Sequence, residues 1–334
     1  MTLNFVQKDT LTGIKEFELL QGDITKLPFK VDLLCISAFK DDYTPTKSSI
    51  VGQLYAKGIN VGNLAQKPHL DLKEGLGIWI SSPISNANFK QIICTEITGH
   101  KRSFEETIKN LFAALSILEI QNEQNETIAI PLLGSGDQGI ELKRVISTLL
   151  DASLDFLKYS RYLRKIYFVV YDEAKASALN DEMNSVLNRK TGITPKSDLA
   201  EILRKDLIKN IDLLINIHND LIVYEDLKRI VSSAFRPFEF GAISRKALES
   251  LINELNPKAS EMFDLMSKIE SLKSQGVSQW IMSYMHTIRI FGNEAVHDKV
   301  QANRNPKSVD EKDLEIGMYC MIRIIDFYLS FRKA

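Results

Sequence analysis

The hydrophobic and polar positions of the first half of the chain change period repeatedly. Short apolar runs alternate with longer segments whose apolar residues recur every three or four positions, which is the helical spacing. The predicted strands are residues 16–21, 31–39, 75–83, 91–98, 126–133 and 165–172, and the clearest predicted helices are residues 104–121 and 142–159. Strands that alternate with helices predict an α/β layered domain with a largely parallel sheet.

The strand pattern fades after about Ser197, and the remaining chain shows only the helical period. Ser197 stands where an N-cap is expected, and Asn256 and Pro257 close one predicted helix and open the next. The predicted helices are residues 198–221, 242–255, 259–273, 278–297 and 311–331. This second half therefore predicts an all-helical bundle.

The junction between the two halves has the composition of a linker. Gly192 and Pro195 lie there among polar residues, and such punctuation is typical of a connection between domains. We expect an α/β domain over residues 1–187, a linker over residues 188–198 and an all-helical domain over residues 199–334.

Composition changes this picture mainly by excluding classes of function. The chain is 44% hydrophobic and 25% charged with a net charge of −1, so no global basic field would hold nucleic acid or an anionic membrane. No apolar run approaches the ~20 residues of a membrane helix, and the N-terminus lacks a signal peptide's apolar core. The three cysteines are far apart, without metal-ligand spacing. We expect a cytosolic protein without a membrane contact, metal or cofactor.

A glycine-rich stretch directly after the fifth predicted strand is the strongest chemical signal in the chain. It consists of Gly134, Ser135, Gly136, Asp137, Gln138 and Gly139. Ligands collect at the carboxyl ends of strands in open α/β sheets, and a glycine turn there exposes backbone N–H groups that suit phosphate oxygens. Taken alone, the stretch is better explained as a tight strand-to-helix turn.

A second signal favours a binding site: the sequence GDIT, which includes Asp23 and Ile24, follows the first predicted strand. The strand that begins with Val31 and Asp32 comes next, and the pattern P-x-x-G-S-G-x-x-G spans Pro131 to Gly139. Together these three features resemble the macrodomain family, which binds ADP-ribose and related nucleotides. The resemblance covers roughly residues 19–172 and implies a three-layer α/β fold. It implies that Asp23 accepts the adenine amino group, that Ile24 supplies a backbone N–H, and that the glycine loop wraps the diphosphate. The implied ligand-binding residues are Asp23, Ile24, Leu133, Gly134, Ser135, Gly136, Asp137, Gln138 and Gly139.

Departures from the family pattern argue against hydrolysis. Hydrolytic macrodomains usually carry an asparagine-bearing stretch like VNAAN, whereas this chain has CISAF, with apolar Ile36 and Phe39. No glycine cluster follows, and Gln138 stands where an aromatic residue often stacks on the distal ribose. The next residues read as an exposed charged loop whose polar side chains could instead bond sugar hydroxyls; they are Asp41, Asp42, Tyr43 and Thr44.

In the helical half, three polar residues are spaced four apart on one predicted helix. Arg289, Asn293 and His297 fall on one stripe. Gly292 lies inside the same helix, where glycine costs about 1 kcal/mol relative to alanine, so we expect it to be needed for close helix packing. The aromatic residues at helical spacing favour a place in the core over base stacking; they are Trp280, Tyr284 and Phe291.

The segments ISRKALESLINEL and RIFGNEAVH together resemble a helical domain of the HEPN type, over about residues 221–331. Such domains are often appended to defence and toxin proteins, and many are dimeric ribonucleases. The resemblance implies His297 as general acid or base, Arg289 as phosphate clamp and Asn293 as an orienting group. Seven residues separate this arginine and histidine, against four to six in the usual motif, so a buried polar network is an equally good interpretation.

The sequence as a whole predicts a divergent macrodomain that senses an ADP-ribose-type nucleotide, coupled to a HEPN-like domain. The helical domain would form a homodimer, with RNA as a candidate substrate, in a setting such as bacterial defence or stress response. Two alternatives stay open: an ADP-ribosyl hydrolase, and a non-enzymatic scaffold in which both domains only bind and dimerise.

Overall fold

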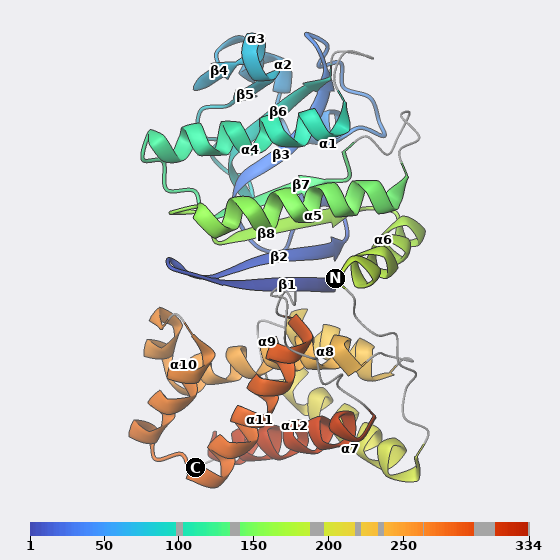
Figure 1. Cartoon of the computed structure of the whole chain (residues 1–334), viewed down its shortest axis with the longest axis vertical. Helices are drawn as coiled ribbons and strands as arrows, with labels where there is room; N and C mark the ends of the chain where they lie inside the picture. Colours follow the sequence, from blue (N-terminus) through green and yellow to red (C-terminus); the bar gives the residue numbers. More distant parts are fainter. Residues whose placement is uncertain are drawn as a thin grey trace. The chain divides into compact units, whose positions relative to one another are not determined.

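A computed structural model gives the structure of the chain (Figure 1). It describes residues 1–97, 103–133, 141–187, 197–217, 222–232, 237–262, 264–296 and 311–332. The chain folds into two compact units. One contains Thr2 and Lys8–Val186, and the other contains Met1, Leu3–Gln7 and Leu187–Ala334.

The first unit is built on an eight-stranded sheet in the order β1-β2-β8-β7-β3-β6-β5-β4, of which residues Leu3–Gln7 of β1 are grouped with the other unit. Neighbouring strands from β2 to β6 pair in parallel, whereas β5 and β4 join the edge antiparallel. The strands are β1 (Thr2–Thr10), β2 (Gly13–Gln21), β3 (Val31–Phe39), β4 (Leu70–Leu72), β5 (Ile78–Ile80), β6 (Phe89–Ile97), β7 (Thr127–Pro131) and β8 (Lys165–Val170). This confirms the mixed α/β domain that the alternating pattern predicts.

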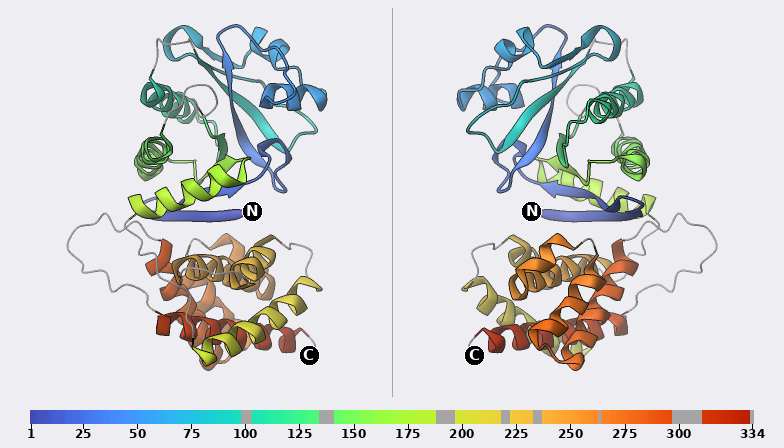
Figure 2. Two further views of the ribbon diagram at one scale, coloured as in Figure 1. Left: turned by 90° about the vertical axis from the view of Figure 1, so that its right-hand side faces the viewer. Right: turned by 90° about the vertical axis from the view of Figure 1, so that its left-hand side faces the viewer.

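Helices cover both faces of this sheet (Figure 2). On one face, α1 and α2 pack over a core that includes Ile36, Trp79 and Cys94. On the other face, α4 and α5 bury apolar residues spaced by three and four, such as Leu111 and Leu149. The helices are α1 (Ile50–Ala56), α2 (Val61–Gln66), α3 (Lys73–Leu76), α4 (Phe104–Ile120), α5 (Leu142–Tyr159) and α6 (Glu173–Val186), with a 3-10 turn η1 (Ile24–Lys26) after β2.

The strand predicted over residues 75–83 is the main local error in this unit. Only β5 forms there, because residues Lys73–Leu76 wind into the short helix α3, which ends at Gly77 with a left-handed φ of 67°. The pattern also gives no strand at Thr2–Thr10. Three polar side chains of β1 are buried, which obscures the apolar signal of a strand; they are Thr2, Asn4 and Gln7.

The second unit is helical, as predicted. Ser197 caps its first helix by accepting a hydrogen bond from the Ala200 N–H at 3.0 Å. Asn256 and Pro257 separate one helix from the next, as the sequence indicates. The helices are α7 (Asp198–Ile215), α8 (Ile222–Ser232), α9 (Pro237–Leu255), α10 (Leu265–Ser271), α11 (Gln279–Val296) and α12 (Glu311–Phe331), with 3-10 turns η3 (Pro257–Glu261) and η4 (Leu272–Gln275).

One helix predicted in this unit is interrupted. The periodic segment 259–273 predicts a single helix, but η3 ends at Glu261 and α10 begins only at Leu265. Asp264 caps α10 by accepting a hydrogen bond from the Ser267 N–H at 2.8 Å. The carboxylate of Asp264 favours the start of a separate helix over one continuous helix, because it accepts a hydrogen bond from a backbone N–H in the first turn of α10.

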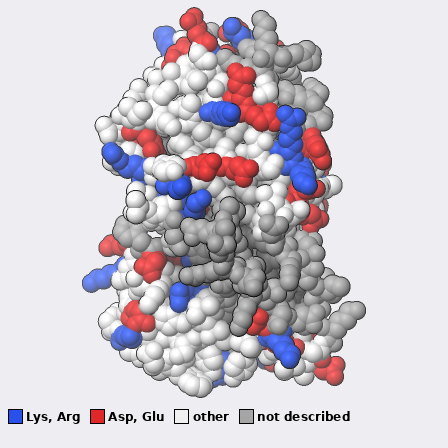
Figure 3. Space-filling model, viewed as in Figure 1, with Lys and Arg blue, Asp and Glu red and all other residues white. Residues whose placement is uncertain are grey.

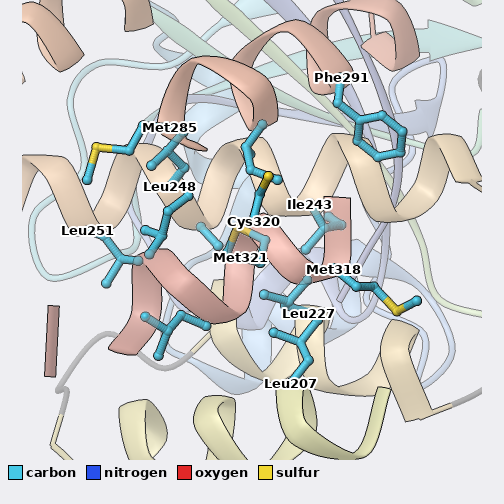
Figure 4. Close-up of a cluster of buried hydrophobic side chains, with 14 of the residues drawn as sticks. Leu207, Leu227, Ile243, Leu248, Leu251, Met285, Phe291, Met318, Cys320 and Met321 are labelled. Carbon is cyan, nitrogen blue, oxygen red and sulfur yellow. The ribbon is translucent and has the colours of Figure 1, made fainter. Parts of the chain in front are cut away.

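The core of the helical unit contains aliphatic, aromatic and sulfur-containing side chains, many of them from α7, α8, α9, α11 and α12 (Figure 4). Phe291 belongs to this core, as predicted, and Tyr284 is partly buried against it. The prediction for Trp280 is wrong, because this side chain is 68% exposed. All three cysteines of the chain are free and buried. No helix among the described residues is long and apolar enough to cross a membrane.

Candidate functional site

The predicted nucleotide site is at the carboxyl end of β2, where the sheet meets the turn η1. The strand ends at Gln21, and the Gly22 N–H donates to the Val170 carbonyl of β8 at 2.9 Å. This bond holds the start of the turn beside the end of the neighbouring parallel strand. Asp23 follows at once, so it lies at the sheet edge where ligands collect in this class of fold.

The carboxylate of Asp23 is hydrogen-bonded by Thr25 at one oxygen and paired with Lys26 at the other. Its Oδ1 accepts hydrogen bonds from the Thr25 N–H at 2.9 Å and the Thr25 hydroxyl at 2.8 Å. Its Oδ2 lies 3.3 Å from Nζ of Lys26, whose side chain is 72% exposed. The side chain of Asp23 is 15% exposed, so Oδ2, which pairs with the exposed Lys26, is the oxygen at which a ligand's amino group could replace that lysine.

The protonation state of Asp23 suits an acceptor. Burial alone would raise its pKa, but the two bonds from Thr25 and the charge of Lys26 lower it below the ordinary value. The group is therefore ionised at neutral pH. An ionised carboxylate only accepts hydrogen bonds, which matches an amino group on the ligand.

Ile24 can contribute only through its backbone. Its side chain is 7% exposed and belongs to the core between the sheet and α1. Leu133, which follows β7, is likewise buried at 4% exposure. The rest of the predicted phosphate loop lies outside the described residues: Gly134, Ser135, Gly136, Asp137, Gln138 and Gly139.

The structure adds an aromatic residue that sequence reasoning missed. Tyr171 directly follows β8, its carbonyl accepts a hydrogen bond from Nε2 of Gln21 at 3.3 Å, and its side chain is 74% exposed. Because Gln21 and Val170 are paired in the sheet, Tyr171 lies next to Gly22 and close to Asp23. An exposed ring in this place can stack on a base. The sequence could have pointed to Tyr171, because this residue lies near the end of the strand predicted over residues 165–172.

The residues at the end of β3 and just after it are not all exposed, although the sequence predicts an exposed loop there. Ile36 is fully buried, whereas Phe39 is 61% exposed. Asp42 is exposed, and its Oδ1 accepts from the Thr44 N–H at 3.0 Å. Tyr43 instead turns inward, since its hydroxyl donates to Oε1 of Glu96 and accepts from Nε1 of Trp79 at 3.0 Å. The expectation of an exposed loop is thus wrong for Tyr43.

The helical unit carries the second group of predicted residues, on α11. Arg289 is half-buried, and its Nε is buried without a hydrogen-bond partner in the described part of the chain. Burial would raise the pKa of Asp264, but bonds from Ser267 and the charge of Arg289 lower it. Oδ1 of Asn293 accepts from Nε of Arg245 at 3.0 Å. His297 lies outside the described residues.

Arg245, on α9, is the partner that sequence reasoning did not assign. It is 3% exposed, and its stem crosses α11 at Gly292. A Cβ at Gly292 would lie 2.5 Å from Cβ of Arg245 and 2.9 Å from the Gly241 carbonyl oxygen. The expectation that close packing needs this glycine is confirmed. The buried guanidinium of Arg245 thus fixes the amide of Asn293, one turn after the half-buried Arg289 on the same helix.

The described residues include no group of three or more His, Cys, Asp or Glu side chains that could hold a metal ion. On the face shown in Figure 3, acidic and basic side chains of the described residues are interspersed. On this face, any contact with a charged ligand therefore depends on individual side chains and backbone groups.

Comparisons with known proteins identify relatives of both halves. Residues 239–329 match the model of a domain of unknown function, DUF4145. The chain is 26% identical over 184 residues to an uncharacterised protein of Pyrococcus horikoshii, covering 48% of this chain and 90% of that protein.

Solved macrodomains match the N-terminal part of the chain at low identity. A mutant Oceanobacillus iheyensis macrodomain with ADPR is 15% identical, with a TM-score of 0.44, covering 55% of this chain and 100% of that one. The Trypanosoma brucei macrodomain in complex with ADP-ribose is 12% identical, with a TM-score of 0.39, covering 49% of this chain and 68% of that one.

Proposed function

We propose that the α/β unit binds an ADP-ribose-type nucleotide at the carboxyl edge of its sheet and acts as a sensor. The observation that carries this proposal is the carboxylate of Asp23. Thr25 fixes Oδ1 of Asp23, while Oδ2 pairs with the exposed Lys26. Tyr171, which follows the neighbouring strand β8, offers an exposed ring. An acceptor and an aromatic ring at the ends of two paired strands suit adenine, whose amino group donates and whose face stacks.

The phosphate-binding part of the proposal rests on the sequence of the glycine loop. Three glycines within six residues after β7 suit a backbone that approaches a diphosphate closely. The loop follows Leu133 at the carboxyl end of a strand that pairs directly with β8, as expected for a loop that shares a ligand with the β2 and β8 ends.

Calorimetric titration with ADP-ribose tests the proposal. Loss of a hydrogen bond to a charged group costs about 1.5–3 kcal/mol, so Asp23→Ala should weaken binding roughly 10- to 150-fold. Gly136→Glu should abolish binding through steric block and repulsion of the diphosphate. Asp155→Ala, which removes an exposed carboxylate from α5, is the matched control and should bind like the wild type. Equal affinity for wild type and Asp23→Ala would refute the adenine assignment.

Sensing is favoured over hydrolysis by the end of β3. Ile36 is fully buried in the core and cannot orient a water or a ribose hydroxyl. The protein should therefore bind ADP-ribose without releasing it from mono-ADP-ribosylated proteins. Clear turnover that disappears in Asp23→Ala would support the hydrolase alternative instead.

The helical unit is proposed as the effector, and the polar cluster of Arg245, Arg289 and Asn293 is the observation that favours this role. Arg289 in this cluster suits the phosphate of an RNA backbone, with His297 as the candidate proton carrier, and a homodimer would bring two such clusters into one cleft. In this proposal His297→Ala ends RNA cleavage and leaves the dimer and its melting temperature nearly unchanged. If sedimentation shows a monomer and the protein cleaves no RNA, the cluster has a structural role only.

A further inference from the structure

The helix α1 contacts the turn η1, whose N-cap is Asp23. Two residues one helical turn apart at the end of α1 reach the same residue of that turn, Thr25. Oε1 of Gln53 lies 3.1 Å from the hydroxyl oxygen of Thr25, and Nζ of Lys57 donates to the Thr25 carbonyl. Since residues four apart lie on one face of a helix, α1 presents both side chains to η1.

Thr25 passes these contacts on to Asp23. It is 4% exposed, so its polar groups need partners within the protein. Its N–H and its hydroxyl both donate to Oδ1 of Asp23, at 2.9 and 2.8 Å, and its carbonyl accepts from Lys57. The polar groups of Thr25 are therefore engaged by Asp23 and by α1. A change at the α1 contact acts directly on the carboxylate that we assign to adenine.

The hydroxyl of Thr25 has one proton and two possible acceptors. Oδ1 of Asp23 lies at 2.8 Å and Oε1 of Gln53 at 3.1 Å. A hydroxyl donates a single hydrogen bond but can accept others. The carboxylate is nearer and charged, which makes it the stronger acceptor, so the proton goes to Asp23. A carbonyl oxygen of Gln53 would then face the lone pairs of the Thr25 oxygen, which is repulsive.

We propose that Gln53 is a positioning residue for the adenine site, with its amide turned so that Nε2 donates to the Thr25 hydroxyl, which donates to Asp23. The two ends of an amide have nearly the same shape, so a half-turn places Nε2 at the position of Oε1. The result is a chain from amide to hydroxyl to carboxylate, in which each bond strengthens the next. The assignment of adenine as the ligand rests on the proposed function, whereas the chain itself does not.

This chain keeps Asp23 ionised. Burial raises the pKa of Asp23, but the bonds from Thr25 and the bond and charge of Lys26 outweigh burial and lower it. Among the described residues, the charged groups that face the turn are Lys26 within it and Lys57 of α1. The strand β7 also contacts η1 but has no charged side chain, and Tyr171 adds a phenol after β8. Without the donor at Gln53, Thr25 is the weaker donor and the pKa of Asp23 rises.

Carbon-13 NMR of the Asp23 carboxyl group measures its pKa in the full chain without any nucleotide, and the signal is assigned by its absence in Asp23→Asn. Gln53→Met keeps an unbranched side chain but removes the donor, so the pKa of Asp23 should rise. If Gln53 instead accepted the hydroxyl proton, its loss would release that proton to Asp23 and the pKa would fall. Gln66→Met, at an exposed position of α2, is the matched control. A fall in Gln53→Met, or the same pKa as in the wild type, would overturn the proposal.

The pH dependence of ADP-ribose affinity connects this role to the proposed function. Asp23 accepts the adenine amino group only when ionised, so calorimetry should show binding lost as the pH falls through its pKa. Gln53→Glu places a second carboxylate on the same hydroxyl, within the ~4–6 Å over which a like charge raises a pKa. Its binding should therefore be lost at a higher pH than that of the wild type, while circular dichroism establishes that it is folded.

The two measurements fail in different ways. If the wild type does not bind ADP-ribose, the proposed function is wrong, and the NMR titration still decides whether Gln53 supports Asp23. If the wild type binds ADP-ribose but Gln53→Met and Gln53→Glu have its pH profile, Gln53 has no positioning role in this site.

Discussion

Replacement of Gly292 by alanine offers the sharpest test of how the helical unit is packed. Alanine is the better helix former by about 1 kcal/mol, so local propensity alone predicts a more stable protein. The structure predicts the opposite. The added Cβ would lie 2.5 Å from Cβ of Arg245, 2.8 Å from its Cδ and 2.9 Å from the carbonyl oxygen of Gly241.

These contacts cannot be relieved by one flexible side chain. Cβ of Arg245 and the Gly241 carbonyl are fixed to the backbone of α9, so α9 and α11 must separate or shift. Overpacking of this kind costs about 1–3 kcal/mol. A shift of Arg245 also strains its 3.0 Å bond to Asn293, a bond worth about 1 kcal/mol. After the gain in propensity, we expect Gly292→Ala to lower the free energy of unfolding by about 1–3 kcal/mol.

Urea unfolding followed by far-ultraviolet circular dichroism measures this change. In a Trp280→Phe background, which leaves Trp79 as the one tryptophan of the sequence, the fluorescence of the fully buried Trp79 follows the α/β unit separately and should be unaffected. Gly75→Ala, in α3, is the control, because nothing lies within 4 Å of its added Cβ. It should be neutral or slightly stabilising. If Gly292→Ala were as stable as the wild type, the close approach of α9 and α11 at this residue would be wrong.

Two further outcomes follow from the pKa shifts. The pKa of Asp23 is lowered in the folded protein from its ordinary 3.8, so the ionised carboxylate stabilises the fold above that pH, and this stabilisation is lost as the pH falls through the folded pKa. The unfolding free energy of Asp23→Asn should therefore approach that of the wild type in acid. A constant difference between the two proteins at all pH values would contradict this. Burial raises the pKa of Cys35 and of Cys94, and raises that of Cys320 to about 11 despite a bond with Thr287, so mass spectrometry should find all three thiols unmodified by iodoacetamide in the native protein and modified in urea.

The local elements were largely determined by the sequence. The pattern places one strand at residues 31–39 and one helix at residues 142–159, and both have these bounds in the structure. The reason is physical: a continuous buried run and a regular three-four spacing each allow only one conformation that buries the apolar side chains. Capping by Ser197 follows in the same way, because it depends on backbone chemistry within one turn.

The sequence also indicated one part of the candidate site. Asp23 directly follows a predicted strand, and the carboxyl edge of a parallel sheet is where ligands collect. That argument needs no knowledge of the neighbouring strands. It stops at Asp23, however, because the sequence does not say which strand lies beside it.

The remaining contacts depend on elements that are distant along the chain. The order β2-β8-β7 places Tyr171 beside Gly22, and the crossing of α9 and α11 brings Arg245 to Asn293. In the same way, the fold buries Glu96 and turns Tyr43 toward it. Periodicity reports which face of an element is buried, but it carries no information about which other element covers that face. Tertiary packing alone decides those pairs, and with them the chemistry that each site can offer.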